Sequence, residues 1–245
     1  MIQNCPFPDR CFTSFPCSSA SAASFNRTLW HKTGSAQIDE VRGMYNSVAN
    51  LSGGGPVLGL HIRGPQLNPQ RDPRWGRNDN SPGECVPPAP AQPPPRSRRR
   101  EIRLTVWHRR DAYLEGQYGA YLVLGGQGAD ISGQYRFGER RKAICEMKHF
   151  DAYSVEDGRD GITDTFDISL RDLVDYYFVP LKACIDIADV GAFMCSCALT
   201  PPDPPASLCF ACLLSLAARA DNAINGTATC GDQWLNVDVV RNTWK

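Results

Sequence analysis

The sequence predicts a parallel α/β fold, either a barrel or an open sheet. Short apolar runs suited to buried strands alternate with segments whose apolar residues recur at helical spacing. This alternation is typical of units in which a helix follows each strand and leads into the next parallel strand. With 245 residues the chain can bury a full core. Periodicity alone leaves the choice between barrel and open sheet undecided.

Helices are predicted at four places. The first shows apolar residues at i, i+3, i+4 and i+7, namely Val41, Met44, Tyr45 and Val48. Another contains Leu170, Leu173, Val174 and Tyr177 at the same spacing. This second helix follows Ser169 and Asp172, which fit a capping box. Segments 117–124 and 231–240 are predicted as further helices.

Buried parallel strands are predicted at 57–62, 143–147 and 190–195, where short apolar runs occur. Polar strings follow these strands. They are Asn68 to Arg77 with Ser81 to Glu84, then Lys148-His149-Phe150, then Gly191 to Ser196. In α/β barrels the residues at the C-terminal strand ends line the active site. The strings therefore mark the expected functional edge of the sheet.

Two segments do not follow the α/β pattern. Segment 85–110 holds six prolines and seven arginines with a single acid, Glu101, for a net charge of 7 − 1 = +6. Such a composition cannot pack a core. Segment 198–221 is proline-rich and then apolar and cysteine-containing. We interpret both as inserts, either retained introns in the gene product or genuine surface loops, which long insertions permit.

Charge and hydropathy exclude two classes of partner. The formal net charge is zero, so no bulk attraction to nucleic acid or to a membrane surface is expected. No apolar run reaches the roughly 18 residues of a membrane span, and the N-terminal residues lack the apolar stretch of a signal peptide. Eleven cysteines and three glycosylation acceptor sequences, at Asn26, Asn50 and Asn225, favour a secretory origin.

The side chains of the polar strings suit sugar binding. Arg77 and Lys148 can donate several hydrogen bonds to neighbouring hydroxyls, and His149 adds a donor or an acceptor. Adjacent strand residues point to opposite faces, so Lys148 and His149 share a ligand only where the strand ends or twists. The alternative is structural: Arg77 pairs with a carboxylate and His149 is a buried, hydrogen-bonded histidine.

The string Arg71-Asp-Pro-Arg-Trp-Gly-Arg77 followed by Ser81-Pro-Gly-Glu84 resembles the motif of family 3 glycoside hydrolases, above all plant and fungal β-xylosidases. Other stretches resemble the same family in the same order. They are 13–16, 23–29, 148–150 with Ala152-Tyr153, 169–174, and 191–196 with 222–226. Together they cover most of residues 11–244.

The resemblance implies a partial (β/α)8 TIM-type barrel, truncated at both ends, formed by residues 1–245 apart from the inserts. It implies a retaining hydrolase of terminal β-linked sugars, most simply xylo-oligosaccharides, that is secreted and needs no cofactor. By motif match Arg77, Lys148 and His149 bind the sugar. The family nucleophile follows an Arg-x-x-Trp helix end, here Arg241 to Trp244, and is expected beyond Lys245. This chain is therefore expected to lack both catalytic carboxylates.

Departures from the family pattern leave two other interpretations open. The family aromatic platform is replaced by Arg63, and the Tyr expected after Ser196 is displaced by Cys197 and the second insert. The chain could accordingly be a non-catalytic carbohydrate-binding remnant or a mis-spliced product. A disulfide between Cys195 and Cys230 is a further expectation. The Cys209-x-x-Cys212 pair lacks the partners of a zinc site, so no metal is expected.

Overall fold

The computed structural model describes residues 11–49, 59–69, 82, 111–135, 138, 140–153, 169–195, 223–224, 227–228 and 233–244. Its centre is a three-stranded parallel sheet in the order β1-β2-β3, with β1 at His61–Gln66, β2 at Ile144–Phe150 and β3 at Ala192–Cys195. The chain is thus α/β, as its pattern predicts. Both inserts, 85–110 and 198–221, lie outside the described residues.

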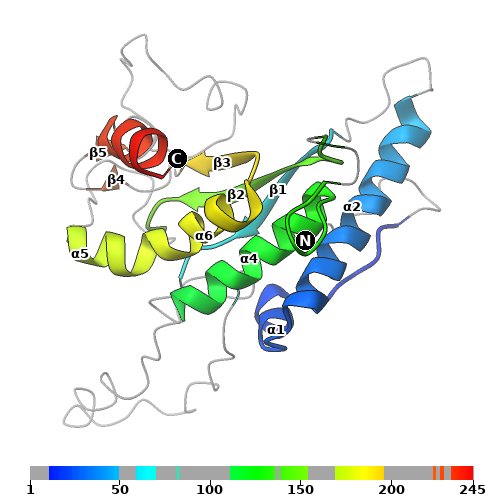
Figure 1. Ribbon diagram of the computed structural model, residues 1–245, viewed down its shortest axis with the longest axis horizontal. Helices are drawn as coiled ribbons and strands as arrows, with labels where there is room; N and C mark the ends of the chain where they lie inside the picture. The colour runs from blue at the N-terminus through cyan, green and yellow to red at the C-terminus, as the bar shows by residue number, and fades with distance from the viewer. Residues whose placement is uncertain are drawn as a thin grey trace.

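The helices connect the strands in sequence (Figure 1). Helix α4 (Ala112–Gln127) joins β1 to β2, and a continuous helix formed by α5 (Leu170–Asp172), η2 (Leu173–Tyr177) and α6 (Phe178–Ala188) joins β2 to β3. The short α1 (Ser18–Ala22) and the long α2 (Arg27–Ala49) precede the sheet. The two-residue strands β4 (Ala223–Ile224) and β5 (Thr227–Ala228) and the π-helix η4 (Trp234–Thr243) follow it.

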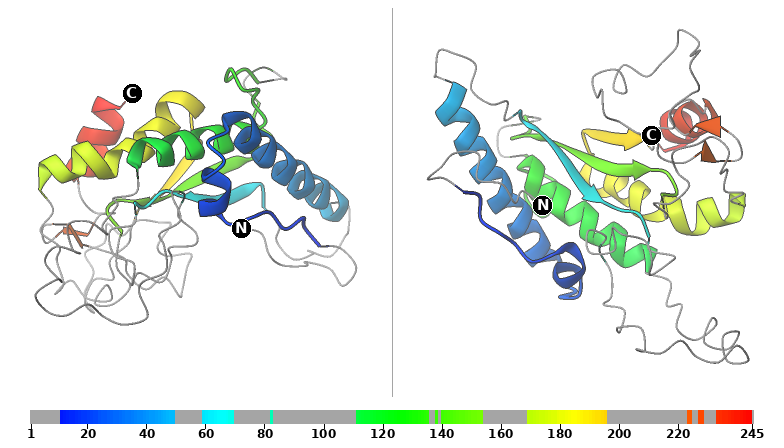
Figure 2. Two further views of the ribbon diagram at one scale, coloured as in Figure 1. Left: turned by 90° about the horizontal axis from the view of Figure 1, so that it is seen from below. Right: turned by 180° about the vertical axis from the view of Figure 1, so that it is seen from behind.

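All the large helices cover the same face of the sheet. Helix α4 packs between α2 and α6, and Figure 2 shows α2, α4 and α6 on one side of the three strands. Right-handed crossovers between strands in the order 1-2-3 place every connecting helix on one face. Alternate residues of β2, Cys145 and Met147, are buried among these helices. The opposite face of the sheet carries no such helical cover among the described elements.

Local sequence explains where the helices begin and bend. Ser169 caps α5: its Oγ accepts a hydrogen bond from Asp172 N at 3.1 Å and donates to Asp172 Oδ2 at 2.8 Å, which confirms the predicted capping pair. Asp111 caps α4 by accepting from Tyr113 N at 2.8 Å. The widened turn η2 ends at Tyr177, shortly before Pro180 in the first turn of α6, and this proline has no N–H to donate to the preceding turn.

Helices α2 and α4 approach closely because both carry glycine at the crossing. A Cβ atom added to Gly125 would lie 2.0 Å from His31 O, and one added to Gly34 would lie 2.2 Å from Leu122 O. Any side chain at these positions would therefore force the two backbones apart. In the part of the chain that is described, no helix is long and apolar enough to cross a membrane.

The strand boundaries differ from the sequence prediction in one respect. The 57–62 run predicts a strand that ends at Ile62, whereas β1 begins at His61 and extends to Gln66. Pairing decides the extent: β1 is held where it meets β2, from His61 opposite Ile144 to Gln66 opposite Lys148. The predictions for 143–147 and 190–195 are confirmed as the cores of β2 and β3.

Candidate functional site

Two of the three predicted site residues, Lys148 and His149, lie where the parallel strands end. Lys148 and His149 are the fifth and sixth residues of β2, and Asn68 follows β1 directly alongside them. Register irregularities occur here in both strand pairs, between Arg63 and Gln66 and between Lys148 and Phe150. The strict alternation of side chains is thus interrupted at Lys148 and His149, as a shared role in ligand binding requires.

His149 is held by the side-chain amide of Asn68. Asn68 Oδ1 accepts hydrogen bonds from His149 N and from His149 Nδ1, both at 2.9 Å. Asn68 Nδ2 donates to His149 O at 2.9 Å. Both side chains are buried, with His149 only 3% exposed. The side-chain amide of Asn68 therefore forms hydrogen bonds with both the backbone and the ring of His149, an arrangement called here the Asn68–His149 clamp.

This clamp also assigns the protons of the ring. A backbone N–H can only donate and a backbone carbonyl can only accept, so the two backbone bonds fix which end of the Asn68 amide is oxygen. That oxygen can only accept, so His149 Nδ1 must carry a proton. In the neutral ring Nε2 is then the acceptor. The motif alone predicts a histidine here, but not its tautomer.

Aromatic side chains support the end of β2. Tyr153 meets the His149 ring edge-to-face, with centroids 4.9 Å apart. Phe150 packs against Phe178, Phe193 and Trp244, with centroids 6.1, 5.4 and 6.0 Å away. Trp244 thereby brings the end of η4, the predicted Arg-x-x-Trp helix end, beside the site. Packing of this kind restricts the movement of the site residues.

Asp151 is a buried carboxyl group at the same strand end, only 1% exposed. Its Oδ1 accepts a hydrogen bond from Ala152 N at 2.5 Å, whereas Oδ2 has no hydrogen-bond partner among the described residues. Burial raises the pKa of Asp151 to about 8, against which the Ala152 bond acts weakly. Asp151 is therefore largely protonated at neutral pH and is a poor nucleophile.

The third predicted residue, Arg77, lies outside the described residues, so the expected convergence of Arg77 with Lys148 and His149 stays a prediction. The same holds for the Cys195–Cys230 pairing, whose side chains also fall outside them. Within the described ranges, no cluster of three or more His, Cys, Asp or Glu side chains could hold a metal ion. Sequence reasoning placed Asn68 in a motif without giving it a role; its position just after a strand was the available signal.

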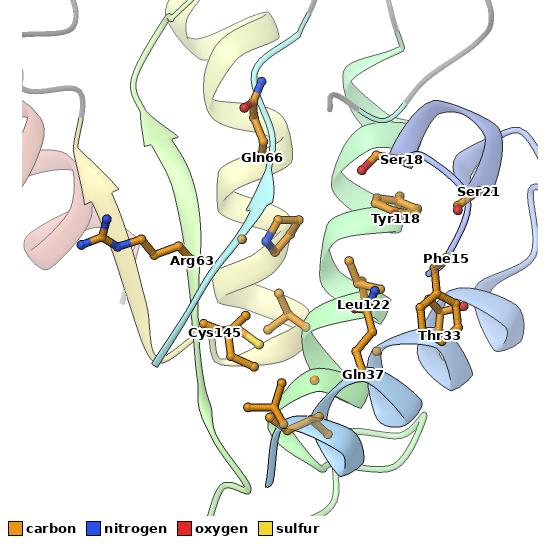
Figure 3. Close-up of a pocket in the computed structure, with 18 of the residues that line it drawn as sticks. Phe15, Ser18, Ser21, Thr33, Gln37, Arg63, Gln66, Tyr118, Leu122 and Cys145 are labelled. Atoms are coloured by element: carbon orange, nitrogen blue, oxygen red, sulfur yellow. The ribbon is translucent and has the colours of Figure 1, made fainter. Parts of the chain in front are cut away.

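A cavity of about 640 Å³ lies beside the free edge of β1, between that strand, α2, α4 and the segment before α1 (Figure 3). Its walls include Tyr118 and Leu122 of α4 and Gln37 of α2. It meets the predicted site only at Lys148. The cavity is thus distinct from the strand-end group formed by Asn68, His149 and Asp151.

The face of the sheet away from the helices is charged. Glu146 Oε1 lies 3.4 Å from His61 Nε2, and Glu146 Oε2 lies 3.9 Å from Arg63 Nε. Arg63 and Glu146 are direct register partners across β1 and β2. Arg63, at the position where the family resemblance implies an aromatic residue, therefore forms a charged pair with Glu146 on this face.

No family model matches the chain. Among curated proteins, Beta-D-xylosidase 1 of Arabidopsis thaliana is 30% identical over 235 residues, which is 95% of this chain and 22% of that protein. A probable exo-1,4-beta-xylosidase of Aspergillus terreus is 28% identical over 235 residues, again 95% of this chain and 22% of that protein. Over nearly its whole length the chain is similar to β-xylosidases of glycoside hydrolase family 3. It spans about a fifth of the length of these relatives.

Solved structures agree at the level of the fold. A family 3 exo-β-xylosidase in complex with a xylobiose aziridine probe aligns with a TM-score of 0.64 and 23% identity, covering 95% of this chain and 22% of that one. β-Glucosidase 3B of Thermotoga neapolitana aligns with a TM-score of 0.59 and 20% identity, covering 96% and 22%. The chain and these enzymes share an α/β arrangement through nearly all of the chain's length.

Proposed function

We propose that the chain is part of the catalytic domain of a glycosidase that removes terminal β-linked sugars, with xylo-oligosaccharides as the substrate class. The observation that carries the proposal is the Asn68–His149 clamp beside Lys148 at the C-terminal ends of parallel strands. Buried polar groups fixed in this way suit recognition of hydroxyl groups in a defined orientation. The relatives' names, β-xylosidases, supply the substrate class.

Each site residue has a proposed role. The Lys148 ammonium donates hydrogen bonds to sugar hydroxyls, and His149 accepts or donates through Nε2 according to its protonation. Arg77, by motif match, adds a guanidinium to the same sugar. Since Asp151 is buried and protonated near neutral pH, we infer that it is not one of the two catalytic carboxylates. The proposed contribution of the described site residues is contact with the sugar.

The three-stranded sheet is proposed to be an arc of a (β/α)8 TIM-type barrel. Three successive parallel strands with their helices on one face are the arrangement that a singly wound barrel repeats. In a barrel the charged face with Glu146 would turn inward. The cavity beside β1 lies where a neighbouring strand would pair with its free edge.

Residues 1–245 are proposed to be one partial family 3 domain, with 85–110 and 198–221 as inserts that are not part of the family fold. The retained-intron origin remains part of this proposal, and genomic and transcript sequences test it. A secretory location is supported by Cys11, which is disulfide-bonded.

The test is sugar binding and turnover by the purified 245-residue chain. Xylose binding is followed by saturation-transfer NMR, and hydrolysis by release from nitrophenyl β-xyloside. We expect binding that Lys148→Met weakens by about tenfold or more, because a hydrogen bond to a charged group contributes about 1.5–3 kcal/mol. Lys182→Met is the matched control and should leave binding unchanged, because Lys182 is a partly exposed lysine of α6 whose ion-pair partner is Asp186.

No hydrolysis is expected from this chain. Binding unaffected by Lys148→Met and His149→Ala would refute the site. Robust hydrolysis abolished by Asp151→Asn would show instead that the chemistry resides in this chain and uses the Asp151 carboxyl group. Binding without turnover is the result that the proposal requires.

A further inference from the structure

A glycosylation acceptor sequence lies at the exposed start of α2. Residues 23–29 are all exposed, and Asn26-Arg27-Thr28 lies in the middle of this run. The Asn-x-Ser/Thr pattern is the acceptor for N-linked sugars, which require a surface position in the folded protein. The other two acceptor asparagines, Asn50 and Asn225, lie outside the described residues. Among the three acceptor asparagines, Asn26 is therefore the one whose surroundings the structure describes.

Asn26 uses its amide oxygen and not its amide nitrogen. Oδ1 accepts a hydrogen bond from Leu29 N at 3.0 Å, which caps the start of α2. No hydrogen bond of the described residues involves Asn26 Nδ2, the atom to which a sugar would be attached. Attachment replaces one hydrogen of Nδ2 and leaves Oδ1 unchanged. Capping and glycosylation are thus compatible at this residue.

The neighbouring side chains leave room for a sugar. Arg27 is directed to α4, where its Nη2 donates to Tyr113 Oη at 3.2 Å and its guanidinium lies 5.4 Å from the centroid of the Tyr121 ring. Phe25 and Leu29 are 63% and 46% exposed. These apolar side chains beside Asn26 offer a surface for the C–H face of a sugar ring. Nothing in the described part of the chain covers them.

We propose that Asn26 carries an N-linked glycan. In the reaction Asn26 Nδ2 forms a bond to C1 of an oligosaccharide, and the bond from C1 to the pyrophosphate of a lipid-linked donor breaks. Nδ2 loses one proton, and the lipid pyrophosphate leaves with the bonding electrons. The donor is a lipid-pyrophosphate-linked oligosaccharide of the secretory pathway, so the inference rests on the secretory location proposed above and not on the catalytic role.

The experiment expresses the full chain behind a supplied, cleavable secretory leader in a eukaryotic host. Total cell protein and medium are both collected, so chain retained in the cell is also scored. Peptide N-glycosidase converts a glycosylated asparagine to aspartate, which peptide mass analysis locates. Asn26 is expected to be converted in the wild type. Since the leader is supplied, failure at Asn26 is distinct from failure of the natural routing.

Three variants sharpen the result. Thr28→Ala removes the acceptor sequence and should eliminate one glycan shift on a gel, whereas Thr28→Ser keeps the sequence and should retain it. Asn26→Asp removes the glycosylation site but preserves an oxygen that caps α2. Loss of the glycan shift in this variant therefore cannot be attributed to unfolding of the start of α2. Leader-cleaved wild-type chain with Asn26 unconverted would overturn the proposal, whatever the state of Asn50 and Asn225.

Discussion

The clamp between Asn68 and His149 makes the ring tautomer a measurable property of the folded chain. Nitrogen-15 NMR of the wild-type imidazole should show a proton on Nδ1 in the neutral ring, because the Asn68 oxygen that faces it can only accept. A proton on Nε2 instead would contradict the assignment. This measurement needs no variant, so it does not depend on any substitution being tolerated.

A substitution tests the same contact energetically. Asn68→Leu keeps the volume but removes three hydrogen bonds of a buried residue. We expect a loss of about 2–4 kcal/mol in the free energy of unfolding. Each hydrogen bond contributes about 1 kcal/mol, and the buried polar groups of His149 that remain would lose their hydrogen-bond partner. The control is Asn46→Leu, an exposed residue of α2. A shift in the His149 tautomer should accompany the loss only for Asn68→Leu.

The buried Asp151 carboxyl predicts a pH dependence of stability. The pKa of this group is about 8 in the folded chain and 3.8 for an unperturbed aspartate. Between these values the native state holds a proton that the unfolded state has released, so the contribution of Asp151 to stability is fully present below about pH 4 and is lost as the pH rises toward about 8. Asp151→Asn should remove this slope, on the order of a few kcal/mol across the window.

Urea unfolding of the wild type and Asp151→Asn at pH 5 and pH 8 measures the effect. The variant should gain stability over the wild type at the higher pH. Asp175→Asn, at an exposed helix position, serves as the control and should keep the wild-type slope. Equal slopes for wild type and Asp151→Asn would mean that Asp151 is ionised in the folded chain.

At the scale of the elements, the contact between α2 and α4 depends on glycine. Gly125→Ala would place a methyl group 2.0 Å from His31 O, and both groups belong to packed helices. Overpacking of this kind costs about 1–3 kcal/mol, which thermal or urea unfolding detects. Gly43→Ala is the matched control in α2, because nothing lies within 4 Å of its added Cβ. It should stabilise by about 0.5–1 kcal/mol through helix propensity.

Opposite signs for these two substitutions would confirm the close helix crossing. Destabilisation by both would indicate that glycine serves another purpose in these helices, and stabilisation by both would mean that α2 and α4 lie farther apart. The crossing matters for the site because α4 also packs against α6 and against the sheet. Separation of α2 from α4 would therefore disturb the layer on which β1 and β2 rest.

At the scale of the whole molecule, the described residues form a one-sided layer. Large apolar side chains, including Met147, Phe150 and Leu181, are buried between the sheet and the helices. The opposite face bears His61, Arg63 and Glu146, and the edge of β1 borders the large cavity. Such an edge is a site where further chain can pair. The asymmetry is consistent with an arc of a larger closed sheet.

The sequence by itself determined the class of the fold and the positions of most elements. Periodicity located the cores of β2 and β3 and parts of all the long helices, because spacing of apolar residues reflects local geometry. The Lys148-His149 string was likewise recognisable from its order among the family motifs. These features depend on neighbours along the chain, which a single sequence displays directly.

Only the tertiary structure decided how the site is organised. The Asn68–His149 bonds join residues 81 positions apart, and no local pattern encodes which amide faces which ring. Asp151 is recognisable in the sequence as a carboxyl group close after Lys148-His149, but its raised pKa arises from burial by elements that meet only in the fold. The extent of β1 and the glycine-dependent approach of α2 to α4 were settled by pairing and packing. Long-range contacts of this kind acquire their energy only when the chain is assembled.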